Sequence, residues 1–171
     1  FIDAIARESD EVPNRLMACS AAIVGYADLR LGDAVEPVLE AHRAASPHRF
    51  RGTRHGVGWD AHPDVPISHT KPKQGLLLDS TFRKGFASLQ KQGLLFDSYL
   101  YHTQLLELVD LARTLPDQPI VLNHFGGPLG VGPYDIWSDE ARDLWKSGIA
   151  ALAKCPNVVA KLGGIAMPRN G

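Results

Sequence analysis

The 171-residue sequence has little of several features that would place it in familiar classes. Its two cysteines, Cys19 and Cys155, are far apart and show no CxxC spacing, so neither a disulfide framework nor a zinc ribbon is indicated. This cysteine usage fits a reducing cytoplasm best. No apolar run approaches the roughly 18–20 residues needed to cross a bilayer, and no signal-peptide pattern is present. We therefore expect a protein that does not bind membranes.

Charge of one sign is also lacking. The sequence has 18 Lys and Arg residues against 19 Asp and Glu residues, and its longest basic cluster is the short run 48–51. A protein that neutralises many phosphates normally shows a basic excess or stripe, so nucleic acid is not an expected partner. What the sequence does have is 44% hydrophobic residues, enough for a well-packed core.

The apolar segments predict alternating strands and helices. We expect strands at 17–26, 48–56, 94–101, 119–124 and 157–162, and helices at 1–10, 33–45, 80–93, 104–115 and 137–154. Four residues are expected to cap helices: Asp33, Asp79, Thr103 and Ser138. The helices are long enough for right-handed crossovers, so the strands should be parallel and adjacent in sequence order.

Each predicted strand ends in polar residues or glycines: Asp28, Arg54 and His55, Tyr99 to His102, Asn123 and His124, and Lys161 with Gly163. The C-terminal ends of parallel strands lie at one face, which is where (β/α)₈ barrels and open α/β sheets both bind ligands. No GxGxxG or GxxxxGK[ST] loop follows a strand, which argues against a nucleotide-binding open sheet. The fold class predicted is therefore α/β.

Five motifs in order carry a family resemblance. They are G-x-R-H at 52–55, F-x-x-G-(x)₃-L-(x)₃-G-L-x-F-D at 82–97, H-x-Q-L at 102–105, V-L-x-H-x-G-x-P at 121–128 and P-N-V-x-x-K-L at 156–162. With these motifs the sequence, over about residues 30–171, resembles the amidohydrolase-related family of TIM-barrel hydrolases. More narrowly, it is similar to the branch that includes sugar-acid lactonases and is related to 2-pyrone-4,6-dicarboxylate lactonase.

The resemblance implies a TIM (β/α)₈ barrel of which residues 1–171 form an incomplete portion within a single domain. The five predicted strands would be the third to seventh, and the first two strands and the eighth would be absent. In the family, the first strand carries a His-x-His pair and the eighth ends in an Asp that activates water, and neither feature occurs in this sequence. The sequence also opens on Phe1 and not on Met, and residues 1–10 read like the middle of a helix, so we expect a fragment.

Two histidines are candidate metal ligands, with a divalent ion such as zinc as the cofactor. His124 follows an apolar strand and corresponds by resemblance to the strand-six histidine, which ligates a metal or polarises the substrate carbonyl. We assign it the catalytic role, against the alternative of a buried histidine bonded to a backbone carbonyl. His102 is either a second ligand or a surface residue. Asn123 should point away from the mouth, because side chains alternate along a strand.

Three residues are candidate substrate contacts. Arg54 offers a bidentate fork for a carboxylate, or forms a structural salt bridge, and His55 stands beside it at the same strand end. Tyr101 should share a strand face with Tyr99, in the core or against substrate. Lys161 is either inward-facing near the site or a surface residue, and a carbamylated lysine is a further possibility in the superfamily.

The function predicted is a hydrolase that opens a small carboxylated lactone with activated water. Two alternatives stay open: a decarboxylase or hydratase of the same superfamily, and a non-catalytic fragment or half-barrel that completes itself by assembly. The expected partners are an anionic small-molecule substrate and, in the assembly alternative, other copies of the chain. Loop 60–75 contains His62 and His69, which could line a lid.

Overall fold

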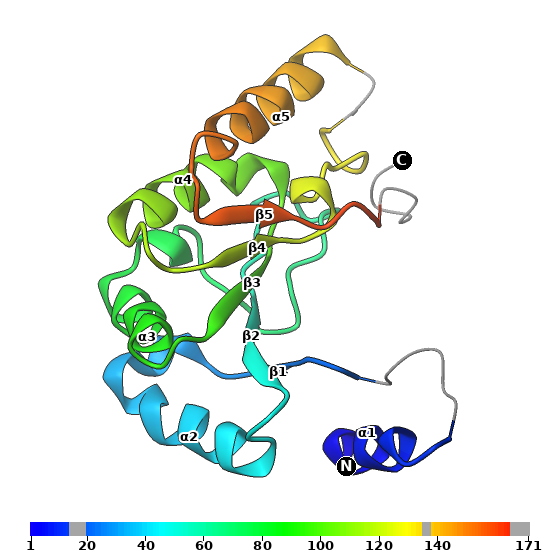
Figure 1. Ribbon diagram of the computed structural model, residues 1–171. Coiled ribbons are helices and arrows are strands. Elements are labelled where there is room, and N and C mark those ends of the chain that lie inside the picture. Colours follow the sequence, from blue (N-terminus) through cyan, green and yellow to red (C-terminus); the bar gives the residue numbers. More distant parts are fainter. Residues whose placement is uncertain (14–19, 135–137, 165–171) are drawn as a thin grey trace.

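The computed structural model describes residues 1–13, 20–134 and 138–164, and its strands and helices alternate along the chain (Figure 1). The strands are β1 (Ile23–Tyr26), β2 (Phe50–Gly56), β3 (Leu95–Tyr99), β4 (Ile120–Leu122) and β5 (Val158–Ala160). The α-helices are α1 (Ile2–Asp10), α2 (Glu36–Ala45), α3 (Ser80–Lys91), α4 (Leu105–Thr114) and α5 (Asp139–Leu152). Four short 3₁₀ helices complete the list: η1 (Leu29–Val35), η2 (Leu76–Leu78), η3 (His102–Gln104) and η4 (His124–Gly126).

The five strands form one parallel sheet in the order β1-β2-β3-β4-β5. This confirms both the predicted direction of the strands and their order. The observed strands are shorter than predicted at their ends, and residues 17–19 of the first predicted strand lie outside the described residues. Neighbouring strands that are all parallel and joined by helices are the arrangement of an incomplete (β/α)₈ barrel.

Two of the four predicted helix caps are correct. The Asp79 carboxylate accepts from the backbone N–H groups of Thr81 and Phe82, and Ser138 Oγ accepts from that of Ala141. The predictions for Asp33 and Thr103 are wrong, because both residues lie inside 3₁₀ helices that precede the α-helices. The true cap before η1 is Asp28, whose side chain accepts from the backbone of Arg30.

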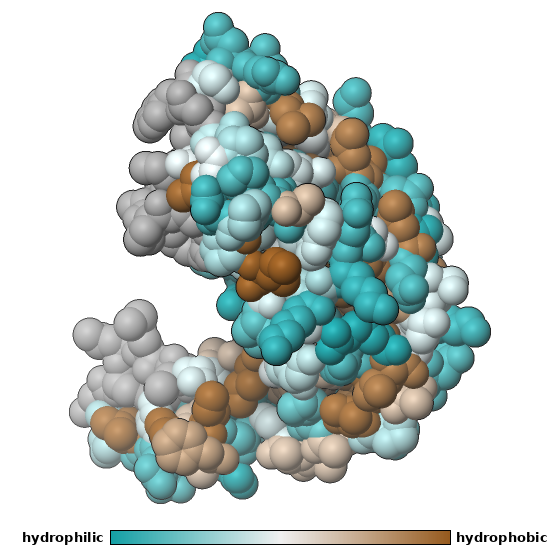
Figure 2. All heavy atoms as spheres, turned by 180° about the vertical axis from the view of Figure 1, so that it is seen from behind, coloured by the Kyte–Doolittle hydropathy of each residue, from teal (hydrophilic) through white to brown (hydrophobic). Residues whose placement is uncertain are grey.

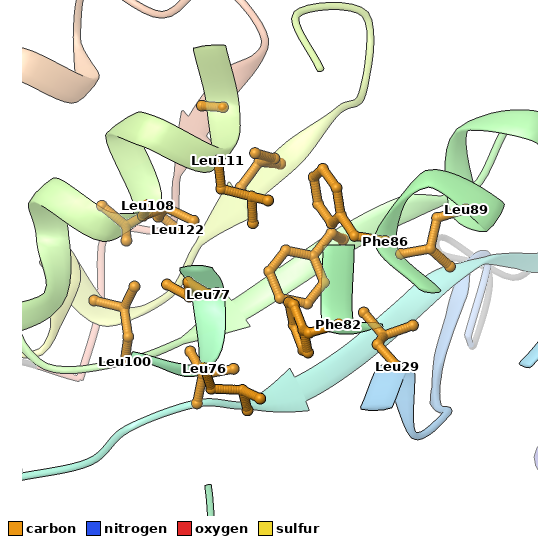
Figure 3. Close-up of a cluster of buried hydrophobic side chains, with 14 of the residues drawn as sticks. Leu29, Leu76, Leu77, Phe82, Phe86, Leu89, Leu100, Leu108, Leu111 and Leu122 are labelled. Atoms are coloured by element: carbon orange, nitrogen blue, oxygen red, sulfur yellow. The ribbon is translucent and has the colours of Figure 1, made fainter. Parts of the chain in front are cut away.

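The hydrophobic core lies between the sheet and helices α2, α3, α4 and α5. Figure 3 shows the part of it to which α3 and α4 contribute. Phe96 of β3 meets Phe82 and Phe86 of α3 edge to face, with ring centroids 6.1 and 5.4 Å apart. Aromatic pairs in this geometry contribute about 0.5–1.5 kcal/mol each beyond the burial of their area. The side of the strands that faces the helices is therefore close-packed.

The other face of the sheet is open in the part of the chain that is described. Figure 1 shows α2, α3 and α4 on one side of the strands, and Figure 2 shows the molecule hollowed on the opposite side. Apolar residues of this open face remain exposed to solvent; Val159 of β5, for example, is 62% exposed. No helix among the described residues combines the length and apolar character that spanning a membrane requires.

Candidate active site

The buried carboxylate of Asp97 is the centre of a polar network on the open face of the sheet. Arg54 donates to it twice, from Nε to Oδ1 at 2.9 Å and from Nη2 to Oδ2 at 3.2 Å. Lys161 Nζ donates to Oδ2 at 2.5 Å, and Asn123 Nδ2 donates to Oδ1. Asn123 Oδ1 in turn accepts from Arg54 Nη2 at 3.3 Å. The network therefore joins β2, β3 and the residues that follow β4 and β5.

The strand register explains why these side chains meet. Arg54 and Asp97 are direct partners in the parallel ladder of β2 and β3. Asp97 in turn pairs with Val121 of β4, and Asn123 lies two residues further along and so points to the same side. The prediction that Asn123 points away is wrong. Strand β4 ends at Leu122, so alternation does not determine where His124 points.

The network also fixes the charge of Asp97. Burial raises the pKa of this carboxyl group, but the hydrogen bonds from Arg54, Lys161 and Asn123 lower it by more, and the pKa falls below its ordinary value. Asp97 is therefore ionised at neutral pH. For Lys161, the inward-facing alternative is correct, because its ammonium group is bound to Asp97.

A pocket of about 310 Å³ opens at the C-terminal ends of the strands, next to this network. The strand side of the pocket contains Arg54, Tyr99, Tyr101 and His124, and the opposite wall is formed by residues 66–69 of the loop after β2. The structure thus brings together three of the predicted site residues, Arg54, Tyr101 and His124. The location agrees with the strand-end position of active sites in this type of fold.

His124 occupies a strained position in this pocket. Its φ is +49°, and that of the next residue, Phe125, is +56°, a region that L-residues enter at a cost. The imidazole ring lies 6.1 Å from the ring of Tyr99, and its Nδ1 atom is buried with no hydrogen-bond partner among the described residues. The alternative of a histidine bonded through Nδ1 to a backbone carbonyl therefore gains no support.

Tyr101 connects the strands to the loop 66–69, which forms one wall of the pocket. Its buried hydroxyl donates to the carbonyl of Pro66, and its ring meets that of Tyr99 nearly edge to face at 6.2 Å, as expected for residues on one face. Thr70 also ties the loop down, because its hydroxyl donates to the carbonyl of Gly56. Tyr101 thus helps to shape the pocket, and its contact with substrate stays a prediction.

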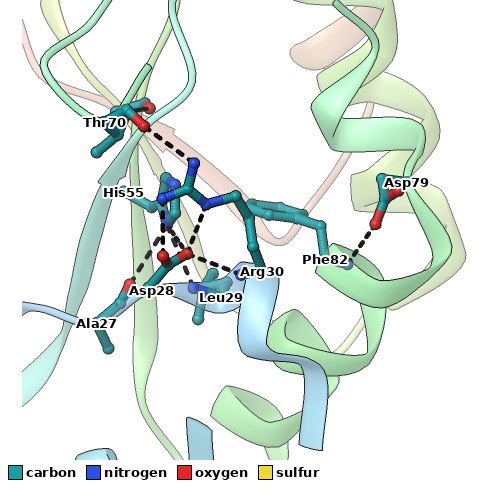
Figure 4. A network of polar contacts seen from close by, with 9 residues as sticks. Ala27, Asp28, Leu29, Arg30, His55, Thr70, Asp79 and Phe82 are labelled. Carbon is teal, nitrogen blue, oxygen red and sulfur yellow. Dashed lines mark hydrogen bonds and ion pairs between the residues drawn. The ribbon is translucent and has the colours of Figure 1, made fainter. Parts of the chain in front are cut away.

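His55 lies on the opposite face of β2 from Arg54. Figure 4 shows its ring near Ala27, Asp28 and Leu29. Its Nδ1 atom is 3.3 Å from both the carbonyl oxygen of Ala27 and the backbone nitrogen of Leu29, and its ring meets Phe82 edge to face at 5.4 Å. Burial lowers the pKa of this histidine. The structure does not bring His55 into the pocket, because neighbouring side chains on a strand point to opposite sides.

His102 lines a second cavity. Its ring is buried, meets that of Tyr134 edge to face at 5.2 Å, and accepts from the backbone N–H of Leu129 at 3.3 Å, so the surface alternative is wrong. This cavity, of about 170 Å³, also contains residues of the first turns of α5 but not His124. Burial lowers the pKa of His102.

Several features of the pocket were not singled out from the sequence. Asp97 was recognised only as part of the L-x-F-D motif, and its central place depends on partners 43 and 64 residues away. Ile67 lines the pocket from the loop, next to His69, which the sequence analysis names as a possible lid residue. The length of that loop was the one signal that pointed to them, since long loops inside compact domains are often functional.

Comparison with known proteins places these observations in a family. A family model described as amidohydrolase matches residues 4–168. An L-fucono-1,5-lactonase from Burkholderia multivorans is 30% identical over 145 residues, and an uncharacterised protein from Sinorhizobium fredii is 34% identical over the same length. Both alignments include 85% of this chain and 44% of the relative, so the chain spans less than half the length of these curated relatives.

Solved structures give the same result. A crystal structure of a Burkholderia multivorans amidohydrolase with bound Zn is 28% identical, with a TM-score of 0.62 over 85% of this chain and 44% of the other. A structure of the same description with bound HEPES is 27% identical, with a TM-score of 0.63 over 95% of this chain and 50% of the other. The family model covers nearly the whole sequence, and the chain belongs to the amidohydrolase family.

Proposed function

We propose that this chain forms the binding wall of a hydrolase that opens a small lactone carrying or releasing a carboxylate. The observation that supports the proposal is the pocket at the strand ends, where Arg54 and His124 lie on the same wall. Asp97 occupies the Nε and Nη2 atoms of Arg54, as the salt-bridge alternative expects, so a substrate anion would bind through the Nη1 atom, which has no partner among the described residues. Beside the His124 imidazole this donor suits an ester substrate with one charged group. The 30% identical L-fucono-1,5-lactonase favours a sugar lactone as the substrate class.

In this reaction a water oxygen attacks the carbonyl carbon of the lactone, the ring C–O bond breaks, and a hydroxy acid forms. Negative charge builds up on the carbonyl oxygen during the attack. We assign to the His124 imidazole the role of donating a hydrogen bond to that oxygen, because the residue lines the pocket. By the resemblance, we expect the base that activates water on the eighth strand of the family barrel.

A metal ion is the expected cofactor, but the described residues do not fit one on their own. No group of three or more His, Cys, Asp or Glu side chains in 1–13, 20–134 and 138–164 could hold a metal ion. The two predicted ligands, His102 and His124, line different cavities. Zinc ligation by this pair stays a prediction, and the mechanism above contains no metal step.

The test is an assay of the longest natural form of the protein with neutral and acidic sugar lactones, L-fucono-1,5-lactone among them. Opening of a lactone releases a proton, which a pH indicator records. The proposal predicts proton release without carbon dioxide. Carbon dioxide released from an acid substrate would identify a decarboxylase instead, and no turnover of any lactone in the panel would contradict the proposal.

A further inference from the structure

Two cations converge on one oxygen atom of a buried carboxylate. Asp97 is only 1% exposed at its side chain, and both Arg54 Nη2 and Lys161 Nζ donate to its Oδ2 atom. The side chains of the two cations are themselves 45% and 46% exposed. Asp97 therefore holds part of each charged group, and nearly half of each of the two side chains is exposed on the open face of the sheet.

Both cations keep donors that no described residue uses. Arg54 binds Asp97 and Asn123 through Nε and Nη2, and its Nη1 atom has no partner in the described part of the chain. Lys161 Nζ carries three donors and makes one hydrogen bond, to Asp97. Both groups are held by the same oxygen, so these unused donors belong to one cluster of side chains.

The charges in this cluster do not cancel. Arg54 and Lys161 supply two positive charges and Asp97 one negative charge, and Asp97 is the only acidic side chain that these two cations contact among the described residues. The remaining unit charge stands on side chains that are nearly half exposed, and one carboxylate neutralises it.

We propose that Arg54 and Lys161 together form an anion subsite that holds the single carboxylate of a sugar acid, with Asp97 as the positioning residue that sets its geometry and charge. The proposal rests on the proposed function and adds Lys161 and Asp97 to it. The ligand class is a polyhydroxy chain with a carboxylate at one end, which an acidic lactone carries or which forms when a sugar lactone opens.

Calorimetric titration with a matched pair of ligands tests the role of Lys161. The probes are L-fuconate and L-fucitol, which differ in having a carboxylate or a neutral alcohol at one end. Lys161→Gln should weaken L-fuconate binding about tenfold or more, the effect of losing a hydrogen bond to a charged group, and leave L-fucitol unchanged. Lys161→Arg should restore most of the affinity.

The control is Lys154→Gln, which removes the same charge from an exposed residue after α5. The proposal is overturned if the wild-type protein does not prefer L-fuconate to L-fucitol. It is also overturned if Lys161→Gln has no effect, weakens both ligands equally, or acts no differently from Lys154→Gln. Because this is a binding experiment, a Lys161-dependent preference for L-fuconate would stand even if no lactone were hydrolysed.

A second variant tests the positioning role of Asp97. Asp97→Asn keeps the shape of the side chain but raises the net charge of the cluster by one unit. The ratio of galactarate to L-fuconate affinity should rise about fivefold, since one unit charge about 4 Å away in water has roughly this effect. Asp97→Glu should return the ratio toward the wild-type value. A merely structural role would weaken both ligands alike, and an unchanged ratio in folded Asp97→Asn contradicts the assignment.

Discussion

The two faces of the sheet are built from alternate residues of the same strands, and they differ in what covers them. On the helix side, Phe96 and its neighbours are fully buried and pack ring to ring. On the open side, Asp97 forms ion pairs with Arg54 and Lys161, and much of Val159 is exposed. Moving by one residue along a strand therefore changes the side chain's environment from a packed core to a charged hollow.

The pair Arg54 and His55 shows what this difference means for function. Both residues end the same strand, and both were predicted to contact substrate. Arg54 points to the open side and lines the pocket, whereas His55 points to the helices and packs against Phe82. A polar residue at a strand end is thus a site residue only when its side chain lies on the open face.

The largest difference between the faces should appear in stability. Phe96→Ala removes a fully buried ring from the helix side and should lower the free energy of unfolding by about 3–5 kcal/mol. Val159→Ala on the open side should change it by no more than about 0.5 kcal/mol, because the residue is 62% exposed. Urea unfolding of both variants makes the comparison. Similar losses for the two would show that the open face is covered in solution.

Catalysis should depend on the open face. We expect His124→Ala to lower kcat for lactone hydrolysis by about 10²–10³, the range seen when a donor to the developing oxyanion is lost, in the longest natural form of the protein. The unfolding midpoint should hardly change, because the ring lies in the pocket and not in the core. His48→Ala, at an exposed position before β2, is the matched control. Wild-type rates in the His124 variant would place the active site elsewhere.

Arg54→Ala should have a smaller and more selective effect. A guanidinium that binds the carboxylate equally in the ground state and the transition state contributes to KM and not to kcat. We expect KM to rise about tenfold for acidic lactones and to stay the same for neutral ones. Arg51→Ala removes a neighbouring arginine whose hydrogen bonds within the described part of the chain go to backbone carbonyls alone, which makes it the control. An equal rise for neutral lactones would argue against a carboxylate clamp.

The sequence predicts the arrangement of the strands better than the arrangement of the site. Apolar periodicity and crossover length depend on nearby residues, and they predicted five parallel strands in the right order. The caps at Asp33 and Thr103 failed because an α-helix and a 3₁₀ turn look alike in sequence. Patterns among nearby residues thus predict the helices and strands, with errors at the ends of these elements.

The site depends on information that no local rule contains. Which face of a strand is open follows from where the helices pack, so Arg54 and His55 could not be told apart from their spacing alone. The cluster around Asp97 needs the registers of three strand pairs to be correct at once. His124 was found because the family motif marks it, although its strained backbone could not be foreseen.

The two faces of the sheet should also differ in how their residues make the free energy of unfolding depend on pH. Burial lowers the pKa of His55 in the folded protein below its ordinary value near 6.5. Between pH 6.5 and the lower pKa of the folded state, His55 is protonated in the unfolded chain but stays neutral in the folded chain. This residue therefore makes the free energy of unfolding fall as the pH drops through that range.

The expected slope from one such proton is at most about 1.4 kcal/mol per pH unit. Urea unfolding between pH 7.5 and pH 5 measures it. His102 adds a slope of its own that is common to the wild type and to His55→Gln. The pKa of Asp28 is lowered mainly by Arg30 and also by His55, so the difference between the two proteins reports His55 together with its effect on Asp28. The variant should lose less stability on acidification than the wild type does, whereas His48→Gln should follow the wild type. Equal slopes for the wild type and His55→Gln would mean that water reaches the His55 ring, as it would on the open face beside Arg54.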